Sequence, residues 1–264
     1  MNEQPLFTVE NLGFAYGETM VLRDISCKLY PGRFYGLIGP NGCGKTTLLD
    51  LLTACKQPAS GTILLRGRPL ADYGKRELAR QLALVPQEFD IGFGFTVEET
   101  VMMGRHPHIG RFQAPAADDW VKVQAAMAAL GIDTFAARPL ASLSGGQKQR
   151  AIVARALAQD TPALFFDEAT ASLDVRHALR ILGIARRLAR EGRLVLAVIH
   201  DLNLAIAFCD SLLIVKDGLL FAQGRANEVM TAAVIAEVFQ TEASVNWNAF
   251  SDAFQISYRY FDAA

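Results

Sequence analysis

One glycine-rich segment restricts the fold of this chain more than any other feature. Residues 39–46 read Gly-Pro-Asn-Gly-Cys-Gly-Lys-Thr and fit the pattern GxxxxGK[ST]. The apolar run Phe34–Ile38 before it predicts a buried strand, and residues 45–55 predict a helix. Glycines let backbone N–H groups turn towards phosphate oxygens, and the start of a helix adds a partial positive charge. The segment therefore predicts a nucleotide-binding loop between a strand and a helix.

Two side chains of this loop have roles that the pattern itself indicates. The ammonium of Lys45 would reach the β and γ phosphates of a nucleotide, and the hydroxyl of Thr46 would be a ligand of Mg²⁺. Cys43 has two interpretations. A helix start lowers a thiol pKa, which would favour a redox switch, but we favour a small side chain at a permissive position.

Short apolar runs alternate with helical patterns along the chain, which predicts an α/β fold with a mostly parallel core sheet. Further buried strands are expected at Leu82–Val85, Ala163–Phe166, 194–199 and 212–215. Residues 7–13 and 21–30 instead favour antiparallel hairpins. Helices are expected near residues 120–130, at 147–159 and at Ala232–Phe239, whereas residues 244–260 form an ambiguous aromatic tail.

These patterns predict three regions. Residues 1–87 and 161–240 would form one nucleotide-binding core, which the family resemblance described below implies to be an ATP-binding core. Residues 88–160 lack a strong strand signal and would form an inserted helical subdomain. Residues 241–264 would be a C-terminal tail, for which a short packing or docking extension is favoured over a regulatory role.

The composition excludes several classes of protein. Hydrophobic residues make up 51% and charged residues 20% of the chain, which excludes a disordered protein. A formal charge of −1 argues against nucleic acid as the main partner. No apolar run approaches the roughly 18 residues of a membrane span, and residues 1–5 lack the pattern of a signal peptide. The four cysteines show no metal-binding spacing, so we expect a globular protein of the reducing cytosol.

Two acids follow the predicted strand Ala163–Phe166. Strand alternation points Asp167 and Glu168 in different directions, so they can hold different roles. Asp167 suits the ligand shell of Mg²⁺, and Glu168 suits polarising an attacking water. The alternative is that both acids cap the following loop. His200 also follows a predicted strand, but a lone histidine there is usually structural.

Residues 143–147 read Leu-Ser-Gly-Gly-Gln and open a predicted helix. One interpretation is an ordinary helix start, with Ser144 as N-cap. The other is a second phosphate-binding helix N-terminus, which a second copy of the chain would supply. That arrangement would be a head-to-tail homodimer that buries two ATP molecules.

Taken together, these motifs resemble the ATPase subunit of ABC transporters from about Leu6 to Phe239. The resemblance implies the P-loop ABC ATPase fold, with an N-terminal antiparallel β subdomain and an inserted helical subdomain. It implies ATP and Mg²⁺ as cofactors. It also implies Glu168, His200, Gln87 and Lys45 as catalytic residues, with Glu168 as the base and His200 as the switch histidine that contacts the γ-phosphate.

The same resemblance implies the remaining site residues. The nucleotide-binding set is Tyr16, which would stack on adenine, with Gly39, Pro40, Asn41, Gly42, Cys43, Gly44, Lys45, Thr46 and Thr47. The signature acting across the dimer is Leu143, Ser144, Gly145, Gly146 and Gln147, with Asp174 of the D-loop. The metal ligands are Thr46, Gln87 and Asp167, and Gln87 would also sense the membrane subunit. Ala169 stands where the family usually has proline, so this turn is expected to be slightly looser without loss of activity.

A closer resemblance concerns the substrate. Residues 103–112, 77–80 and 200–205 are similar to segments in ATPases of ferric-siderophore, haem and cobalamin importers. We therefore expect an importer ATPase for an iron(III) chelate; the alternatives are cobalamin, haem or molybdate import, an exporter ATPase, or a soluble ABC ATPase acting on nucleic acid. His106 and His108 are expected near the docking surface and not as iron ligands.

The expected partners follow from the same resemblance. They are a second copy of the chain, two integral-membrane permease subunits and, indirectly, a substrate-binding protein, with no nucleic acid. The expected location is peripheral, on the cytoplasmic face of the inner membrane.

Overall fold

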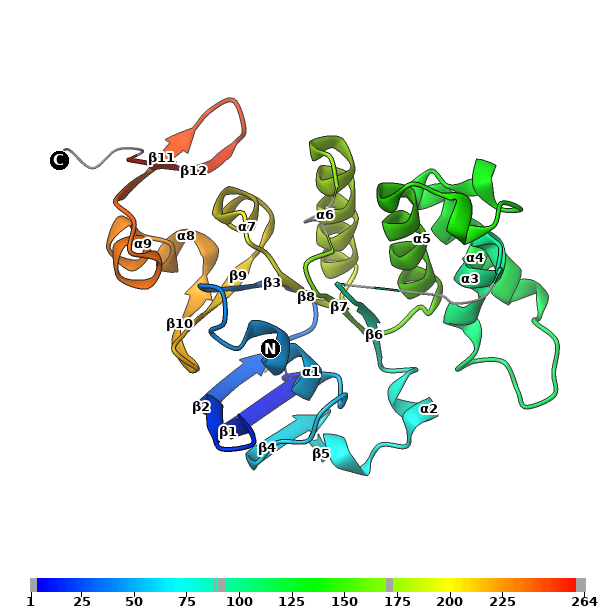
Figure 1. Cartoon of the computed structure of the whole chain (residues 1–264), viewed down its shortest axis with the longest axis horizontal. Helices are drawn as coiled ribbons and strands as arrows, with labels where there is room; N and C mark the ends of the chain where they lie inside the picture. Colours follow the sequence, from blue (N-terminus) through cyan, green and yellow to red (C-terminus); the bar gives the residue numbers. More distant parts are fainter. Residues whose placement is uncertain (1–3, 88, 90–93, 170–172, 260–264) are drawn as a thin grey trace. The chain divides into compact units, whose positions relative to one another are not determined.

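The computed structural model describes residues 4–87, 89, 94–169 and 173–259 (Figure 1). The chain divides into two compact units. The first contains Met1–Asp72 and Leu188–Ala264, and the second contains Tyr73–Arg187. The predicted helical subdomain, 88–160, lies inside the second unit, which also includes two parallel strands; the boundaries at 88 and 160 remain predictions.

The first unit contains an antiparallel sheet. Its strands are β1 (Phe7–Tyr16), β2 (Thr19–Leu29), β4 (Ser60–Leu65) and β5 (Arg68–Pro69), in the order β2-β1-β4-β5. Strand β1 pairs with β2 in the register Phe7↔Leu29, and Tyr16 pairs with Thr19 across the turn. In β2, buried and exposed residues alternate from Ile25 to Leu29, as expected for a sheet with one covered face. The predicted N-terminal antiparallel region is confirmed.

The first unit also carries four strands of the core sheet. They are β3 (Phe34–Ile38), β8 (Leu194–Val198), β9 (Ser211–Lys216) and β10 (Leu219–Arg225), in the order β10-β9-β3-β8. Strand β3 is parallel to both β8 and β9, and β10 is antiparallel to β9. All residues of β3 and β8 are buried. Their continuous apolar runs are typical of strands that are covered on both faces.

The helices of this unit are α1 (Lys45–Leu52), η1 (Leu70–Asp72), α7 (Leu202–Phe208), α8 (Ala226–Val229) and α9 (Ala232–Phe239). Helix α1 is shorter than predicted, because the chain turns after Thr53 and Ala54 has a φ of +56°. The aromatic tail forms an antiparallel hairpin of β11 (Ala243–Asn248) and β12 (Ala253–Tyr258). Strand β12 packs on α7, and β11 follows α9 (Figure 1).

The second unit contains β6 (Leu82–Val85) and β7 (Ala163–Phe166), which are parallel with Leu82 opposite Ala163. Its helices are α2 (Lys75–Leu78), α3 (Val97–Met102), η2 (Met103–Arg105), α4 (Ala117–Leu130), η3 (Asp133–Phe135), η4 (Leu140–Ser142), α5 (Gly145–Ala158) and α6 (Val175–Arg190), the last of which ends in the first unit. Helices α3, α4 and α5 pack against one another around buried Val101, Val123 and Ile152. The predicted strands and the helices near 120–130 and 147–159 are confirmed.

Helix length and hydropathy also bear on membrane insertion. In the part of the chain that the structure describes, no helix is both long and apolar enough to span a membrane.

Candidate nucleotide-binding and hydrolysis site

The glycine-rich loop connects the end of β3 to the start of α1, as predicted. Gly39 and Gly44 have φ values of +152° and +104°, in the region that favours glycine. A Cβ atom at Gly39 would lie 2.0 Å from the Val215 carbonyl oxygen, and one at Gly44 would lie 2.5 Å from a methyl carbon of Leu22. Glycine is therefore required at both positions by the backbone angle and by the close approach of neighbouring residues.

The start of α1 is suited to an anion. Gly44 occupies its N-cap position and supplies no side-chain cap, and the first turn contains no acidic residue. The first N–H groups of a helix lack partners within the helix, and they carry the positive end of the helix dipole. This geometry matches the needs of a bound phosphate.

Lys45 provides the clearest test of whether this loop fits a nucleotide. Its side chain is buried, with 6% of the residue exposed, and Nζ donates hydrogen bonds to the carbonyl oxygens of Gly39 (2.9 Å) and Pro40 (2.8 Å). Among the described residues, the ion pairs found do not include Lys45. Burying a charge costs free energy unless an opposite charge accompanies it. A triphosphate supplies that charge, so the loop fits ATP.

Cys43 lies in the same loop and is 6% exposed. Burial is the largest influence on its thiol and raises its pKa, although nearby Lys45 opposes this effect. A raised pKa lowers the thiolate fraction and therefore the reactivity of the thiol. The geometry supports a small buried side chain and opposes a redox switch.

The remaining predicted residues of the first unit lie at the ends of strands. Tyr16 ends β1 and is 50% exposed, as a ring available for stacking must be. His200 is exposed and lies two residues after the end of β8 and two residues before the start of α7. Asp201 caps α7, because its Oδ1 accepts hydrogen bonds from the N–H groups of Asn203 (2.8 Å) and Leu204 (3.1 Å). The exposed position of His200 is compatible with a nucleotide contact.

In the second unit, the structure brings Gln87 and Glu168 together. Gln87 Nε2 donates a hydrogen bond to Glu168 Oε2 at 2.8 Å. Asp167 continues the pairing of β6 and β7, because its N–H donates to the Val85 carbonyl at 2.8 Å. Asp167 is buried, whereas Glu168 is half-buried and has a φ of +49°, so the two acids differ in environment as predicted.

The chemistry of the predicted metal ligands fits Mg²⁺. Thr46, Gln87 and Asp167 offer hydroxyl, amide and carboxylate oxygens, the hard donors that this cation prefers. Gln87 uses its amide nitrogen to bond Glu168, which leaves its side-chain oxygen for a cation. The donor set is therefore suitable, although Thr46 and the other two residues belong to different units.

The signature motif opens α5, with Ser144 at the N-cap. Gln147 folds back, and its Oε1 accepts a hydrogen bond from the Ser144 N–H at 3.0 Å. Within the described residues the Ser144 side chain makes no capping hydrogen bond, and a Cβ atom on Gly145 would meet nothing within 4 Å. Both interpretations of the motif therefore remain compatible with the geometry: α5 has an ordinary cap from Gln147 and an open start.

Asp174 precedes α6 and pairs with His177. Its carboxylate accepts hydrogen bonds from the His177 backbone N–H (2.9 Å) and from Nδ1 (2.8 Å), and the backbone bond is the main reason that its pKa is lowered. Residues 170–172, between Ala169 and the predicted D-loop residue Asp174, and residues 90–93 lie outside the described part of the chain.

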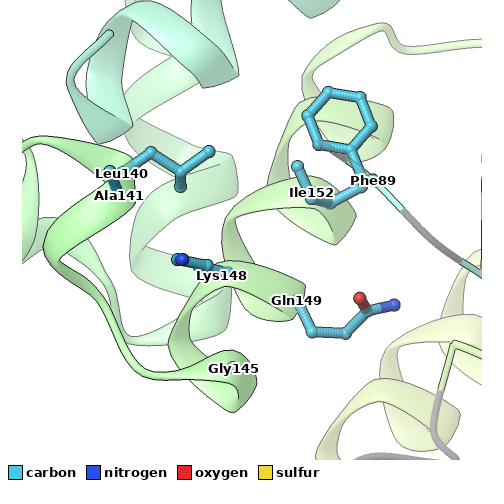
Figure 2. A pocket seen from close by; sticks show the side chains of 7 residues that line it. All are labelled: Phe89, Leu140, Ala141, Gly145, Lys148, Gln149 and Ile152. Carbon is cyan, nitrogen blue, oxygen red and sulfur yellow. The ribbon is translucent and has the colours of Figure 1, made fainter. Parts of the chain in front are cut away.

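A pocket of about 240 Å³ lies beside the start of α5 in the second unit (Figure 2). Its lining residues come from η4, α5 and the segment after β6: Phe89, Leu140, Ala141, Gly145, Lys148, Gln149 and Ile152. The guanidinium carbon of Arg155 lies 4.1 Å from the centre of the Phe89 ring. The pocket therefore has an aromatic and aliphatic lining with an amide and an ammonium at its side.

The segment predicted near the docking surface is held by buried polar contacts that sequence reasoning missed. Arg105 is 3% exposed, its Nε lies 2.9 Å from Asp119 Oδ1, and Nη1 donates to the Ala158 carbonyl at 2.8 Å. His108 Nε2 lies 2.8 Å from the Gln159 carbonyl oxygen, and burial lowers its pKa. These contacts give His108 a structural role.

Comparison with known proteins places the chain in a family. A family model described as ABC transporter matches residues 22–171. The chain is 38% identical to the iron(3+)-hydroxamate import ATP-binding protein FhuC of Bacillus subtilis (strain 168), over 90% of this chain and 89% of that protein. It is 42% identical to the cobalamin import ATP-binding protein BtuD of Halobacterium salinarum (strain ATCC 29341 / DSM 671 / R1) over 90% of this chain, but spans only 59% of that relative's length.

Solved structures show the same architecture. A chain of a metal-chelate type ABC transporter in an inward-facing conformation matches with a TM-score of 0.83 and 28% identity, over 98% of this chain and 99% of that one. The dimeric bacterial ABC transporter cassette MJ0796 matches with a TM-score of 0.75 and 25% identity, over 83% of this chain and 98% of that one. The chain therefore belongs to the ABC transporter family and has the fold of its ATP-binding proteins.

Proposed function

We propose that this chain is the ATP-hydrolysing subunit of an ABC importer and powers uptake of an iron(III) chelate through separate membrane subunits. The observation that carries the proposal is the phosphate loop, in which the buried Lys45 ammonium donates to the Gly39 and Pro40 carbonyls beside a helix start that has no side-chain cap among the described residues. A bound phosphate would supply the negative charge that compensates the buried ammonium. The reaction is ATP + H₂O → ADP + phosphate.

In this proposal the catalytic residues divide into three tasks. Lys45 holds the β and γ phosphates, and His200 contacts the γ-phosphate. Glu168 acts as general base on the attacking water, and the 2.8 Å bond from Gln87 orients its carboxylate. Thr46, Gln87 and Asp167 hold Mg²⁺, which when bound neutralises charge on the phosphates.

A homodimer completes the proposed site. The signature residues 143–147 and Asp174 of one copy would face the nucleotide of the other, so that ATP lies between two chains. The open start of α5 and the unused capping capacity of Ser144 support this role. The dimeric MJ0796 cassette, with the same fold, supports the assembly.

The proposed partners are two membrane subunits at the cytoplasmic face and, through them, a substrate-binding protein. ATP binding would close the dimer and hydrolysis would reset it, so that the membrane subunits alternate in access. Gln87 lies two residues from Phe89, which lines the pocket beside α5, so a subunit seated there could be coupled to the Glu168 carboxylate. The coupling would run through this short segment.

The cargo assignment rests on relatives. FhuC, a hydroxamate importer protein, is matched along 89% of its length, and the chain of a metal-chelate type transporter along 99%. Cobalamin is the second candidate, because the BtuD relative has the higher identity of 42%. In this proposal the residues that contact the cargo belong to other polypeptides, so a transport measurement is needed to distinguish an iron(III) chelate from cobalamin.

Uptake by the native cells tests the cargo. Cells with Glu168→Gln would be compared with the parent and with a Glu237→Gln control, which changes an exposed glutamate on α9. Labelled ferric hydroxamate, haem, cobalamin and molybdate would be supplied separately. We expect selective loss of ferric hydroxamate uptake in Glu168→Gln cells. Loss of cobalamin uptake alone would identify the second candidate, and unchanged uptake of all four would contradict the importer proposal.

A further inference from the structure

The half-exposed ring of Tyr16 is held from two sides. The Phe14 ring packs edge-on against it, with centroids 4.9 Å apart and an interplanar angle of 85°. The Lys56 ammonium lies 5.2 Å from the centre of the Tyr16 ring. Lys56 and Thr47 also hydrogen-bond the Tyr16 hydroxyl, and these bonds, in that order, lower its pKa. The contacts grip the hydroxyl and one edge while half of the residue remains exposed.

Lys56 is itself fixed by the end of α1. Its ammonium forms an ion pair with Asp50, and Asp50 raises the Lys56 pKa more than any other group does. The N–H groups of Cys55 and Lys56 both donate to the Asp50 carbonyl, at 2.9 and 3.2 Å, so the backbone turns back over the helix end. Lys56 is thus brought to Asp50 and Tyr16 by the fold of the turn.

Helix α1 connects this cluster to the phosphate loop. Lys45 begins the helix, and Thr47 and Asp50 are three residues apart, a spacing that puts them on one face. The helix therefore places the Tyr16 anchor at a set distance from the phosphate contact. A half-exposed tyrosine without an anchor would lose rotational freedom on stacking, which weakens binding.

We propose that Lys56, held by Asp50, is a positioning residue that fixes the Tyr16 ring for stacking on the nucleotide base. The inference rests on the proposed function, in which Tyr16 stacks on adenine. Lys56 acts through Tyr16 and has no role towards the phosphates. Its removal therefore weakens binding only of ligands that carry a base.

The test compares ATP with inorganic tripolyphosphate, which lacks a base. Both would be titrated calorimetrically into the full chain without Mg²⁺, so that ATP is not hydrolysed. For Lys56→Met we expect ATP affinity to fall about three- to tenfold, the scale of reordering one side chain on binding, and tripolyphosphate affinity to stay unchanged. Lys28→Met, which changes an exposed lysine on β2, is the matched control and should bind both like the wild type.

Two further variants make the test independent of folding defects. In a Tyr16→Phe background, which lacks the hydroxyl, Lys56→Met should cause no further loss of ATP affinity. Asp50→Asn should weaken ATP binding in the same direction, and it replaces Lys56→Met if that variant does not fold.

Equal losses for ATP and tripolyphosphate, or an ATP affinity of Lys56→Met equal to that of Lys28→Met, would overturn the inference. A wild type that binds no ATP would instead overturn the proposed function.

Discussion

At the scale of single residues, phosphate binding and folding stability place opposite requirements on the side chain of Lys45. In the proposed function its ammonium binds phosphate, yet it is buried, and its hydrogen bonds among the described residues go to the carbonyl oxygens of Gly39 and Pro40. Such a site lowers the stability of the free protein in return for affinity, because an apolar side chain of similar length would avoid the cost of burying charge. The conflict between stability and binding can be measured.

Lys45→Met should separate these two properties. We expect ATP binding to fall by at least about tenfold, because a charge-assisted contact to phosphate is lost. The midpoint of thermal unfolding should stay equal or rise, since methionine fills the space without a charge. Calorimetry of binding and of unfolding on the same samples checks both. A large fall in the unfolding midpoint with retained ATP binding would contradict this reading of the loop.

Some residues of interest can be identified from a short stretch of sequence, whereas others can be identified only from the folded structure. Residues 39–46 and Glu168 belong to contiguous patterns whose chemistry can be read from neighbouring letters. The turn after α1 brings Lys56 back to Tyr16, and no sequence pattern predicts that contact. Likewise, nothing local pairs Arg105 with Asp119, which are brought together by helix packing.

At the scale of elements, the Arg105–Asp119 pair joins η2 to the first turn of α4, and Arg105 also caps the carbonyls at the end of α5. Desolvation raises the pKa of Asp119, but hydrogen bonds from Arg105 and from the Ala116 N–H outweigh it and the pKa is lowered. A lowered pKa in the folded state adds stability above the ordinary value of 3.8, and this stability is lost as pH falls through the folded pKa.

Arg105→Met should therefore destabilise the second unit. We expect a loss of about 3–5 kcal/mol in the free energy of unfolding, because the buried Asp119 carboxylate loses its partner. Asp119→Asn should remove part of the acid sensitivity of the wild type below the ordinary carboxyl range. Denaturant unfolding at neutral pH and at pH values below about 4 measures both effects. An Arg105→Met variant as stable as the wild type would exclude a stabilising role for the pair.

The C-terminal hairpin is attached to α7 through Asn203. Its side chain accepts a hydrogen bond from the Ile256 N–H at 2.7 Å and donates to the Ile256 carbonyl at 3.2 Å, and Ile256 is buried. Asn203→Leu should release β12 from α7, at a cost of about 1–3 kcal/mol for the unpaired backbone groups. Hydrogen exchange at Ile256 should quicken while exchange in β3 stays unchanged. Equal protection at Ile256 in both proteins would show that apolar packing alone holds the hairpin.

Local patterns predicted some elements better than others. Strand β3 was predicted at its observed bounds, because a strand covered on both faces is a continuous apolar run that can be identified from its own sequence. Residues 244–260 were ambiguous because Ile256 is the one buried residue of β11 and β12, and the hairpin depends on packing against α7 and α9, which the local sequence does not show. The end of α1 was predicted three residues late because the turn at Ala54 has no glycine to mark it.

At the scale of the whole molecule, the proposed function uses residues from both units and from a second chain. The phosphate loop belongs to the first unit, and Gln87, Glu168 and the signature belong to the second. Sequence order and the family match support their joint action, since the ABC transporter family model matches residues 22–171 of the chain, which include most of these motifs. Hydrolysis and ATP-dependent dimer formation therefore test the proposed function most directly.

The most direct measurement follows ATP hydrolysis and molar mass of the purified chain, wild type against Glu168→Gln, with Glu237→Gln as control. We expect Glu168→Gln to lower kcat by about 10²–10⁴-fold, because the general base is lost. We also expect light scattering to show an ATP-dependent dimer of this variant, because bound ATP persists. A Glu168→Gln chain that hydrolyses ATP at the wild-type rate and stays monomeric with ATP would contradict the central claim.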